Sequence, residues 1–378
     1  MKIAIELQPC LKNRSGVGVY TYELSKRLQA YEQIELQGDV FNFLERNDLK
    51  QDLMGIDFNK ETCKLFPYGV YRRIWHYLPI KYNQLFKREA QLTHFFNFIV
   101  PPRIQGKVMN TIYDLTFEFY PETMDKRNLR RIKRDLAYSL ERPDKIITIS
   151  EATKQDMIQH LRVDPSKIEV IYCGVDFKHF NEARNNSQSV REKYQLPDQY
   201  ILYIGTLEPR KNIETLIEAF KRFKIEGDKS NAEIKLVLAG KKGWLYEGIF
   251  KKIQELGLED DVVDLGYIDE IDKPALYQMA QCFVFPSIYE GFGIPVIEAM
   301  AAGTPVITTN VSSLPEVAGE AGLLVDPKDT IAIAESMYQL TTNEAKKQEL
   351  IQKGYTQAQK FSWETSAEKL YRVYKELL

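Results

Sequence analysis

The sequence has little cysteine and little histidine, with four residues of each among 378. The cysteines form no CxxC pair and accompany no histidine cluster, which argues against a disulfide framework and against a zinc site. No apolar run approaches the roughly 18 residues that a membrane-spanning helix needs. The chain begins MKIAIELQP, which is typical of a strand and lacks the charged start and long apolar core of a signal peptide. These absences predict a cytoplasmic protein with reduced thiols.

The length and the charge distribution indicate two domains. A chain of 378 residues is too long for one ordinary core and fits two domains of about 150 to 200 residues each. Residues 1–172 carry 27 Lys and Arg against 22 Asp and Glu, or +5, and the remainder carries 24 against 31, or −7, which sum to the net charge of −2. Because the overall charge is not basic and no nucleic-acid-binding module is recognisable, nucleic acid is not an expected partner.

Apolar runs alternate with helical periodicity, which predicts an α/β fold with parallel sheets covered on both faces. The stretch 181–189 is polar and aperiodic and predicts an exposed linker. The most informative stretch is 283–305, which contains YEGFGIPVIEAM. It predicts a buried strand, a loop with Gly291 and Gly293, and a helix that begins at Pro295 and ends before Gly303. Helix amides point into the space beside such a loop, so the unit predicts an anion site.

Two glutamates of this stretch, Glu290 on the loop and Glu298 in the first helical turn, stand eight positions apart. Carboxylates accept hydrogen bonds from hydroxyl groups, so the two side chains can bind two parts of one ligand. The alternative is that Glu298 complements the helix dipole and that Glu290 is a solvated loop residue.

The motif resembles the E-x7-E signature of retaining glycosyltransferases of family 4 through Glu290, Gly291, Phe292, Gly293, Pro295 and Glu298. The resemblance covers essentially the whole chain and implies the GT-B architecture, in which two Rossmann-like domains with parallel sheets face each other across a cleft. It implies an acceptor-binding domain at 1–175, a donor-binding domain at 176–360, and a terminal helix, 361–378, that crosses back to the first domain.

The resemblance also implies roles for these residues. In the family, the first glutamate lies by the transferred sugar, the second binds ribose hydroxyls, and loop amides hold sugar and phosphate. The loop residues are here Gly291, Phe292, Gly293 and Ile294.

A second segment, GTLEPRKN at 205–212, follows a predicted strand and precedes a helix. Arg210 and Lys211 stand beside amides that favour an anion, which favours phosphate binding over an exposed pair without a specific role. The family carries Arg and Lys here to stabilise the leaving nucleotide diphosphate. Its frequent Arg after Gly205 is replaced by Thr206, and Arg210 is expected to compensate. The resemblance further places Tyr267 and Ile268 against the nucleobase, and the alternative is a buried tyrosine.

The first half supplies weaker candidates. Gly16 and Gly18 lie between a strand and a helix, where they form either a plain turn or, as the resemblance implies, a contact with the donor diphosphate. Strands predicted at 92–100 and 108–113 each end in polar residues, among them His94 in the first and Tyr113 and Asp114 in the second.

The family segment that resembles the second of these strands often carries His before Asp. Tyr113 stands at that position here, so contacts with the sugar are expected from Tyr113, Asp114 or His94. Ser150 is predicted to cap a helix whose amides face the same cleft.

Two segments are rich in basic residues. The stretch 68–88 interleaves aromatic residues with Arg72, Arg73, Lys81, Lys87 and Arg88, and a helix near 126–134 carries six Lys and Arg. Both read either as solvated faces or as a peripheral contact with the inner face of the cell membrane. Their place in the half that binds acceptor in the family favours the membrane.

The expected activity is transfer of a hexose, first mannose from GDP-mannose, to a glycan or lipid-linked acceptor in cell-surface polysaccharide or glycolipid synthesis. No Asp-x-Asp pair occurs in the cleft segments, so no metal or other cofactor is expected. Glu290, Arg210, Lys211, Asp114 and Tyr113 are the predicted catalytic residues. The alternatives are a UDP- or dTDP-sugar donor carrying glucose, rhamnose or N-acetylglucosamine, a nucleotide-sugar epimerase or hydrolase, and a silent nucleotide-binding subunit.

Overall fold

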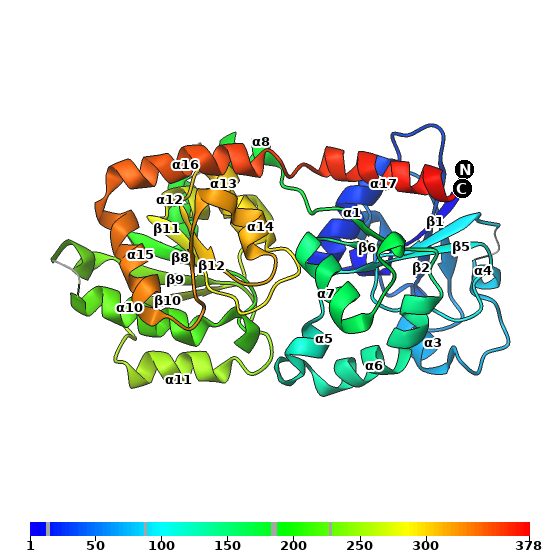
Figure 1. Cartoon of the computed structure of the whole chain (residues 1–378), viewed down its shortest axis with the longest axis horizontal. Coiled ribbons are helices and arrows are strands. Elements are labelled where there is room, and N and C mark those ends of the chain that lie inside the picture. The colour runs from blue at the N-terminus through cyan, green and yellow to red at the C-terminus, as the bar shows by residue number, and fades with distance from the viewer. Residues whose placement is uncertain (13–15, 87–88, 183–186, 227–228) are drawn as a thin grey trace. The chain divides into compact units, whose positions relative to one another are not determined.

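The computed structural model describes residues 1–12, 16–86, 89–182, 187–226 and 229–378. It divides into two compact units (Figure 1). The first unit comprises Met1–Phe117, Lys126–Cys173 and Trp363–Leu378, and the second comprises Glu118–Asp125 and Gly174–Ser362. The division therefore falls two residues before the predicted boundary, and the short segment 118–125 belongs with the second unit.

The described strands of the first unit form a seven-stranded sheet in which every neighbouring pair is parallel. In spatial order they are β3 (Asn59–Cys63), β2 (Glu35–Phe41), β1 (Lys2–Glu6), β4 (Leu92–Phe95), β5 (Lys107–Ile112), β6 (Lys145–Thr148) and β7 (Ile168–Val170). The strand predicted at 92–100 is wrong in length, because β4 ends at Phe95. Phe96, Ile99 and Val100 are nevertheless buried. The apolar run at 96–100 therefore indicates burial rather than strand pairing.

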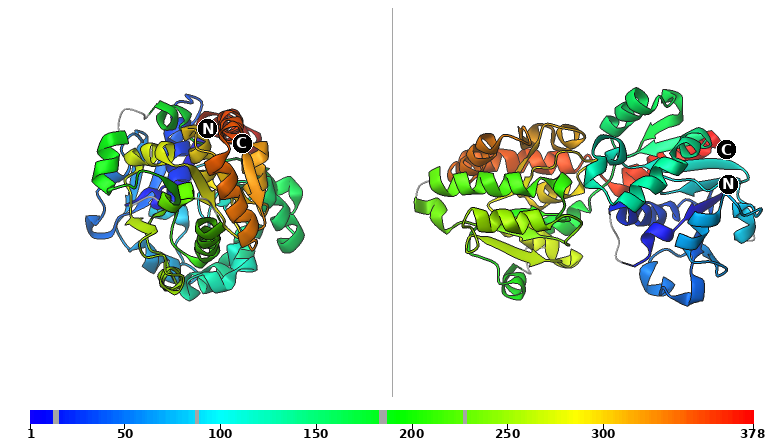
Figure 2. Two further views of the ribbon diagram at one scale, coloured as in Figure 1. Left: turned by 90° about the vertical axis from the view of Figure 1, so that its left-hand side faces the viewer. Right: turned by 90° about the horizontal axis from the view of Figure 1, so that it is seen from below.

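The helices of the first unit are α1 (Gly16–Leu28), α2 (Leu49–Asp52), α3 (Tyr68–Ile74), α4 (Tyr82–Leu85), α5 (Thr116–Phe119, at the unit boundary), α6 (Lys126–Glu141), α7 (Glu151–Leu161) and α17 (Trp363–Leu377). The terminal helix α17 packs against α1, where Arg27 Nε lies 2.7 Å from Glu364 Oε1. Both ends of the chain lie at one edge of this unit (Figure 2). The Met1 amino group and the Tyr371 hydroxyl both bind Gln33, which holds that edge together.

The described strands of the second unit form a six-stranded parallel sheet. In spatial order they are β10 (Val262–Gly266), β9 (Lys235–Ala239), β8 (Tyr200–Ile204), β11 (Cys282–Phe285), β12 (Val306–Thr309) and β13 (Gly322–Val325). Strands β8 and β11 are buried along their whole length, as expected for a parallel sheet covered on both faces. The alternation predicted from the sequence is confirmed.

The helices of the second unit are α8 (Phe177–Glu182), α9 (Ser187–Tyr194), α10 (Ile213–Glu226), α11 (Glu247–Glu255), α12 (Lys273–Met279), α13 (Ile294–Ala302), α14 (Leu314–Ala318), α15 (Thr330–Thr342) and α16 (Glu344–Ala358). Figure 1 shows α10 and α11 on one face of the sheet and α13 and α16 on the other. The linker predicted at 181–189 is wrong where the chain is described, because α8 reaches Glu182 and α9 starts at Ser187; residues 183–186 lie outside the described residues. No described helix is long and apolar enough to cross a membrane.

Candidate functional site

Three glycines join the carboxyl ends of β8, β9 and β10. The amide of Gly205 donates to Ala239 O at 2.9 Å, and the amide of Gly240 donates to Gly266 O at 2.7 Å. Gly240 has φ +145°, and a Cβ there would lie 1.9 Å from Gly205 O, so only glycine permits this approach. Ligands of open parallel sheets gather at the carboxyl ends of the strands, which is the edge that these backbones form.

Two predicted donor contacts lie at this edge with exposed side chains. Thr206, directly after Gly205, is exposed. Tyr267 is 53% exposed, and the Lys241 ammonium lies 4.6 Å from the centre of its ring. The alternative of a buried tyrosine is therefore wrong, whereas Ile268 is buried and offers its backbone alone. An exposed aromatic face beside a cation suits stacking on a planar base.

A charged cluster forms where the loop after β11 meets the turn η6 (Pro209–Lys211). Arg210 Nη1 lies 2.9 Å from Glu290 Oε2, and the Lys211 ammonium donates to Glu290 Oε1. Arg210 Nη2 also lies 2.8 Å from Glu208 Oε1. The predicted catalytic residues of the second unit are thus in mutual contact. The alternative of an exposed basic pair is wrong, because both side chains are largely buried.

The electrostatics of the cluster keep Glu290 ionised. Burial raises the pKa of the Glu290 carboxyl, but the nearby charges of Arg210 and Lys211 outweigh burial and lower that pKa to about 2. At neutral pH the carboxylate can accept hydrogen bonds but cannot donate a proton. Glu290 is thus suited to binding hydroxyl groups.

Backbone and side-chain hydrogen bonds position this cluster. Asn212 takes a left-handed conformation, φ +59°, and its Nδ2 donates to Pro286 O at 3.0 Å and to Pro327 O at 2.6 Å. The amide of Ile288 donates to Arg210 O at 3.0 Å. Because these bonds tie η6 to the loop after β11, Arg210 and Lys211 are held against Glu290.

Ser312 and Ser313, just before α14, fix the loop after Glu290 by hydrogen bonds. Ser313 Oγ donates to Glu290 O and to Phe292 O, each at 2.9 Å, and the amide of Glu290 donates to Ser312 Oγ at 2.9 Å. Phe292 is buried and packs edge-on against Phe361. The Phe292 side chain is therefore not available for the predicted ligand contact, for which its backbone remains.

Helix α13 begins one residue earlier than predicted, at Ile294, with Gly293 as N-cap at φ +105°. A Cβ at Gly293 would lie 2.8 Å from Leu314 Cδ2, which explains the glycine. Among the described residues, no side chain caps this helix. Of its first three residues, Pro295 has no N–H and the Val296 amide donates to Gly293 O at 2.9 Å, so the capacity to bind an anion rests on the Ile294 amide.

Glu298 lies in the second turn of α13, so its predicted position in the first turn is wrong. Its Oε2 accepts from the Tyr277 hydroxyl at 3.0 Å, and Lys273 Nζ lies 3.7 Å from its Oε1. Burial raises the pKa of the Glu298 carboxyl against the opposing effect of Lys273. The Glu298 side chain contacts α12 and lies beyond the first turn of α13. The alternative, that Glu298 complements the helix dipole, is therefore not supported.

The candidates of the first unit lie near the carboxyl ends of its strands. Gly16 is exposed and Gly18 is buried, both in the first turn of α1. Tyr113 directly follows β5 but is buried, and its hydroxyl lies 3.4 Å from Phe96 O. Asp114 is half-buried and accepts from the Thr116 amide at 2.9 Å. The predicted cap is confirmed, because Ser150 Oγ accepts from the Thr153 amide at 3.0 Å, although Ser150 itself is buried.

His94 is the penultimate residue of β4, but its side chain lies in the core. Its ring nitrogens contact the Tyr374 hydroxyl at 2.7 Å and Thr111 Oγ1 at 3.0 Å. Burial lowers the pKa of His94 to about 3, so the ring is neutral. His94 is a core residue under α17 and has no open position for a ligand in this structure.

Sequence reasoning missed Glu208, Lys273 and Tyr277. Lys273 and Tyr277 are four residues apart on one helix, a spacing that predicts a shared face. Their partner Glu298 comes from α13, however, and no local pattern links the two helices. Glu208 lies inside the segment GTLEPRKN, but no spacing rule pairs it with Arg210.

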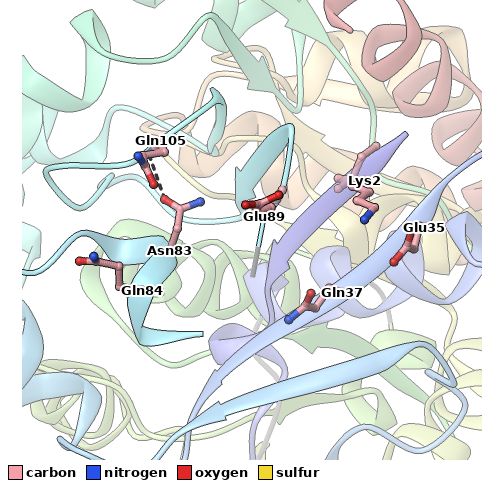
Figure 3. Close-up of a pocket in the computed structure, with 9 residues that line it drawn as sticks. Lys2, Glu35, Gln37, Asn83, Gln84, Glu89 and Gln105 are labelled. Atoms are coloured by element: carbon pink, nitrogen blue, oxygen red, sulfur yellow. Dashed lines mark hydrogen bonds between the residues drawn. The ribbon is translucent and has the colours of Figure 1, made fainter. Parts of the chain in front are cut away.

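A cavity of about 710 Å³ lies at the opposite edge of the first unit's sheet (Figure 3). Lys2 and Glu35, at the amino ends of β1 and β2, line it together with side-chain amides such as Asn83 and Gln84. Within the first unit, the predicted site residues lie along α1 and near the carboxyl ends of the strands. This cavity is therefore not the predicted site.

Two family models match the chain, Glycosyltransferase Family 4 over residues 14–179 and Glycosyl transferases group 1 over residues 186–357. The O-antigen chain mannosyltransferase B of Escherichia coli is 31% identical over 385 residues, which cover 100% of each chain. The serotype-specific mannosyltransferase WbdA of Escherichia coli is 33% identical over 243 residues, which cover 64% of this chain and 30% of WbdA. The solved structure of sucrose-phosphate synthase (tll1590) from Thermosynechococcus elongatus has a TM-score of 0.78 at 22% identity, covering 100% of this chain and 99% of that one.

Proposed function

The chain belongs to the glycosyltransferases of group 1 and family 4, with the GT-B architecture, and from this premise we propose that it transfers mannose from GDP-mannose with retention of configuration. The acceptor is a glycan or a lipid-linked glycan of a cell-surface polysaccharide. The observation that carries the proposal is the contact of Arg210 and Lys211 with Glu290 beside the uncapped start of α13. It brings together donors for a diphosphate and an acceptor for sugar hydroxyls.

Each part of the donor has a proposed partner. The guanine stacks on Tyr267, and Glu298 accepts from the ribose hydroxyls. The diphosphate lies against Arg210, Lys211 and the Ile294 amide at the start of α13. An ammonium has three donor hydrogens, and the Glu290 contact uses one of those of Lys211, so Lys211 can bind Glu290 and a phosphate oxygen together.

The proposed chemistry is displacement on the same face of the sugar. Arg210 contacts one oxygen of the Glu290 carboxylate and Lys211 the other, which lowers its nucleophilicity, so Glu290 orients the sugar hydroxyls rather than attacking the anomeric carbon. The bond from the anomeric carbon to the phosphate oxygen breaks, the acceptor oxygen bonds to that carbon, and the acceptor proton passes to the leaving phosphate. Negative charge grows on that phosphate, where Arg210 and Lys211 stabilise it. Because these two cations supply the positive charge that a metal ion would otherwise provide, we propose that no metal is required.

Mannose is preferred because the segments EPRKN, EGFGIP and SSLPEVAGEAG resemble those of mannosyltransferases, and because O-antigen mannosyltransferase B and WbdA bear that activity in their names. UDP- and dTDP-sugars are the alternative donors. An epimerase or a hydrolase would instead form product without an acceptor.

We expect GDP to raise the melting temperature of the purified protein, and UDP and dTDP to raise it less, with and without EDTA. A ligand at 100 times its Kd stabilises a protein by about 2.7 kcal/mol, which a thermal shift detects. A larger shift with UDP or dTDP would replace GDP-mannose as the proposed donor by a UDP- or dTDP-sugar. Loss of the shift in EDTA would contradict metal independence. No shift with any of the three would count against the donor site.

We also propose that the first unit touches the membrane surface through one face, formed by α3, the turns up to residue 81, and α6. Arg134 Nη2 donates to Arg72 O at 3.2 Å, and His76 Nε2 lies 2.8 Å from Asp135 Oδ1, so the two basic segments adjoin. The face exposes the apolar residues Val70, Tyr77 and Ile80 and the basic residues Arg73, Lys81, Lys126, Arg127, Arg130 and Lys133. Lys87 and Arg88 lie outside the described residues.

Replacing Arg130 and Lys133 together by glutamine should weaken binding to vesicles that contain phosphatidylglycerol about 10- to 30-fold, because each basic residue near an anionic surface contributes about 1 kcal/mol. Co-sedimentation measures the affinity. The control is the pair Lys346→Gln and Lys353→Gln on α16, which changes the net charge equally. If both double variants lost vesicle affinity equally, net charge alone would explain the effect, which would contradict the proposed face.

A further inference from the structure

The cavity at the amino ends of β1 and β2 has no role in the transfer proposed above (Figure 3). Its volume of about 710 Å³ is within the range of small-molecule sites, roughly 300 to 1,000 Å³. Lys2 of β1 lies with Glu35 and Gln37 of β2 on one side of it, and α4 contributes Asn83 on the other. Three elements thus surround an open space that can receive a ligand.

Asn83 is a buried polar residue of the cavity wall, with 4% of its surface exposed. Its Oδ1 accepts from the Gln105 amide at 2.9 Å, and because a backbone amide only donates, this bond fixes which end of the side chain is the nitrogen. Within the described residues, no hydrogen bond engages that Nδ2, which Figure 3 shows on the side toward Glu89. Buried N–H groups are rarely left without a partner, so these two donors require a polar ligand or the water that a ligand displaces.

The polar groups opposite Asn83 are unpaired as well. Lys2 and Glu35 are register partners on the parallel strands β1 and β2. In the part of the chain that the structure describes, however, the Lys2 ammonium, the Glu35 carboxylate and the Gln37 side-chain amide have no hydrogen-bond or ion-pair partner. The wall therefore presents donors and acceptors that the protein itself does not use.

The composition of the wall selects the class of ligand. A phosphate group is disfavoured because two carboxylates, Glu35 and Glu89, accompany a single ammonium, that of Lys2. An apolar ligand is disfavoured because, among the described residues that line the cavity, only Ile3 and Ala90 are apolar. No three His, Cys, Asp or Glu residues within the described ranges are arranged to hold a metal ion. A saccharide fits this wall, because a hydroxyl donates to a carboxylate and accepts from an amide or an ammonium.

We propose that this cavity binds a saccharide segment of the glycan, at a second site separate from the site of transfer. The inference rests on the transfer to a glycan proposed above. The cavity belongs to the first unit, whereas Arg210, Lys211 and Glu290 belong to the second. Two sites on one enzyme raise the effective concentration of a chain that is long enough to occupy both. A long acceptor should therefore bind more tightly than a short one.

The test measures binding of α-linked trisaccharides of mannose, glucose and galactose by saturation-transfer NMR. We expect the wild type to bind at least one of them. Asn83→Asp keeps an oxygen that accepts from the Gln105 amide and removes the two donors, so it should lower that affinity about 10-fold. Gln37→Leu, at a half-buried position, should lower it about 3- to 10-fold. The thermal shift by GDP should stay unchanged in both variants.

The matched control is Asn42→Asp, which makes the same change at an asparagine that is also 4% exposed. Asn42 directly follows β2, at the end of that strand opposite to the cavity. Its Nδ2 donates to Asn47 O at 3.1 Å, so this variant should lose stability and keep its trisaccharide affinity. Equal affinity of the wild type, Asn83→Asp and Gln37→Leu, or no trisaccharide binding by the wild type, would overturn the second site.

Kinetics with acceptors of two lengths relate the cavity to transfer. In Asn83→Asp, the KM for a long glycan acceptor should rise about 10-fold, while kcat and the KM for a monosaccharide acceptor stay those of the wild type, because a single sugar cannot occupy both sites. An equal rise in KM for both lengths would also overturn the second site. Failure of GDP to bind would instead count against the donor site and would leave the trisaccharide affinities measurable, so the two failures are distinguishable.

Discussion

Replacing Lys211 by alanine should lower turnover about 100- to 1,000-fold and leave the protein folded, because removing one group that stabilises developing charge has an effect of this size. In the proposed reaction, the leaving phosphate gains negative charge, and the Lys211 ammonium is one of the two cations beside Glu290. Glu290 keeps its contact with Arg210 at 2.9 Å in this variant. The loss of stability should therefore stay below the roughly 3 to 5 kcal/mol that follows when a buried charge loses its partner.

The measurement is the rate of GDP release from GDP-mannose in the presence of a glycan acceptor, together with the melting temperature. Lys224→Ala is the matched control, because the Lys224 side chain is 11% exposed against 12% for Lys211 and lies 3.0 Å from Asp261 Oδ1. Both variants lose a largely buried ammonium that pairs with a carboxylate. A near wild-type rate in Lys211→Ala would remove Lys211 from the mechanism.

The sequence predicts well what depends on neighbours in the chain. Strands such as 200–204 are continuous apolar runs, and Ser150 lies at the start of a helix in a position that favours a cap. The loop and helix around Gly293 combine a left-handed residue with a proline at the helix start, and both are legible locally. For this helix only the first residue differs from the prediction, by one position.

Contacts between distant segments could not be predicted in this way. Lys211 and Glu290 are 79 residues apart, and their pairing depends on the adjacency of β8 and β11 in the sheet. His94 illustrates the opposite error, in which a ligand contact is predicted for a residue of the core. A polar residue next to an expected strand end resembles a ligand contact. Its partner Tyr374 lies 280 residues away on α17, and this contact places His94 in the core.

Gly240 illustrates a third kind of limit. The segment VLAGKK shows a glycine after a strand, which is a common end for a strand and singles out nothing. Its role depends on the backbone of Gly205, 35 positions earlier, which comes within 1.9 Å of the place that a Cβ would occupy. A steric need of this kind is visible only when both strands are placed side by side.

Gly240→Ala should therefore destabilise the second unit by about 3 to 5 kcal/mol, from overpacking and from the positive φ together. The clash is with a backbone oxygen, which cannot rotate away as a side chain can, and the φ of +145° is unfavourable for alanine. A change of this size lowers the melting temperature of a unit of this length by about 10 °C. The same shift of backbone displaces Gly205 and Thr206, so the affinity for GDP should fall as well.

Gly257→Ala separates the two causes. Gly257 also has a positive φ, +60°, but a Cβ there meets no atom within 4 Å among the described residues, so this variant carries the backbone strain alone, about 1 to 2 kcal/mol. Thermal unfolding of both variants, with and without GDP, measures the difference. If Gly240→Ala has the same melting temperature as Gly257→Ala and binds GDP like the wild type, the close approach of β8 and β9 is not what holds this edge of the sheet. If it melts lower and binds GDP weakly, the steric contact between two backbones shapes the donor site, and the glycine belongs to that site although its own atoms touch no ligand.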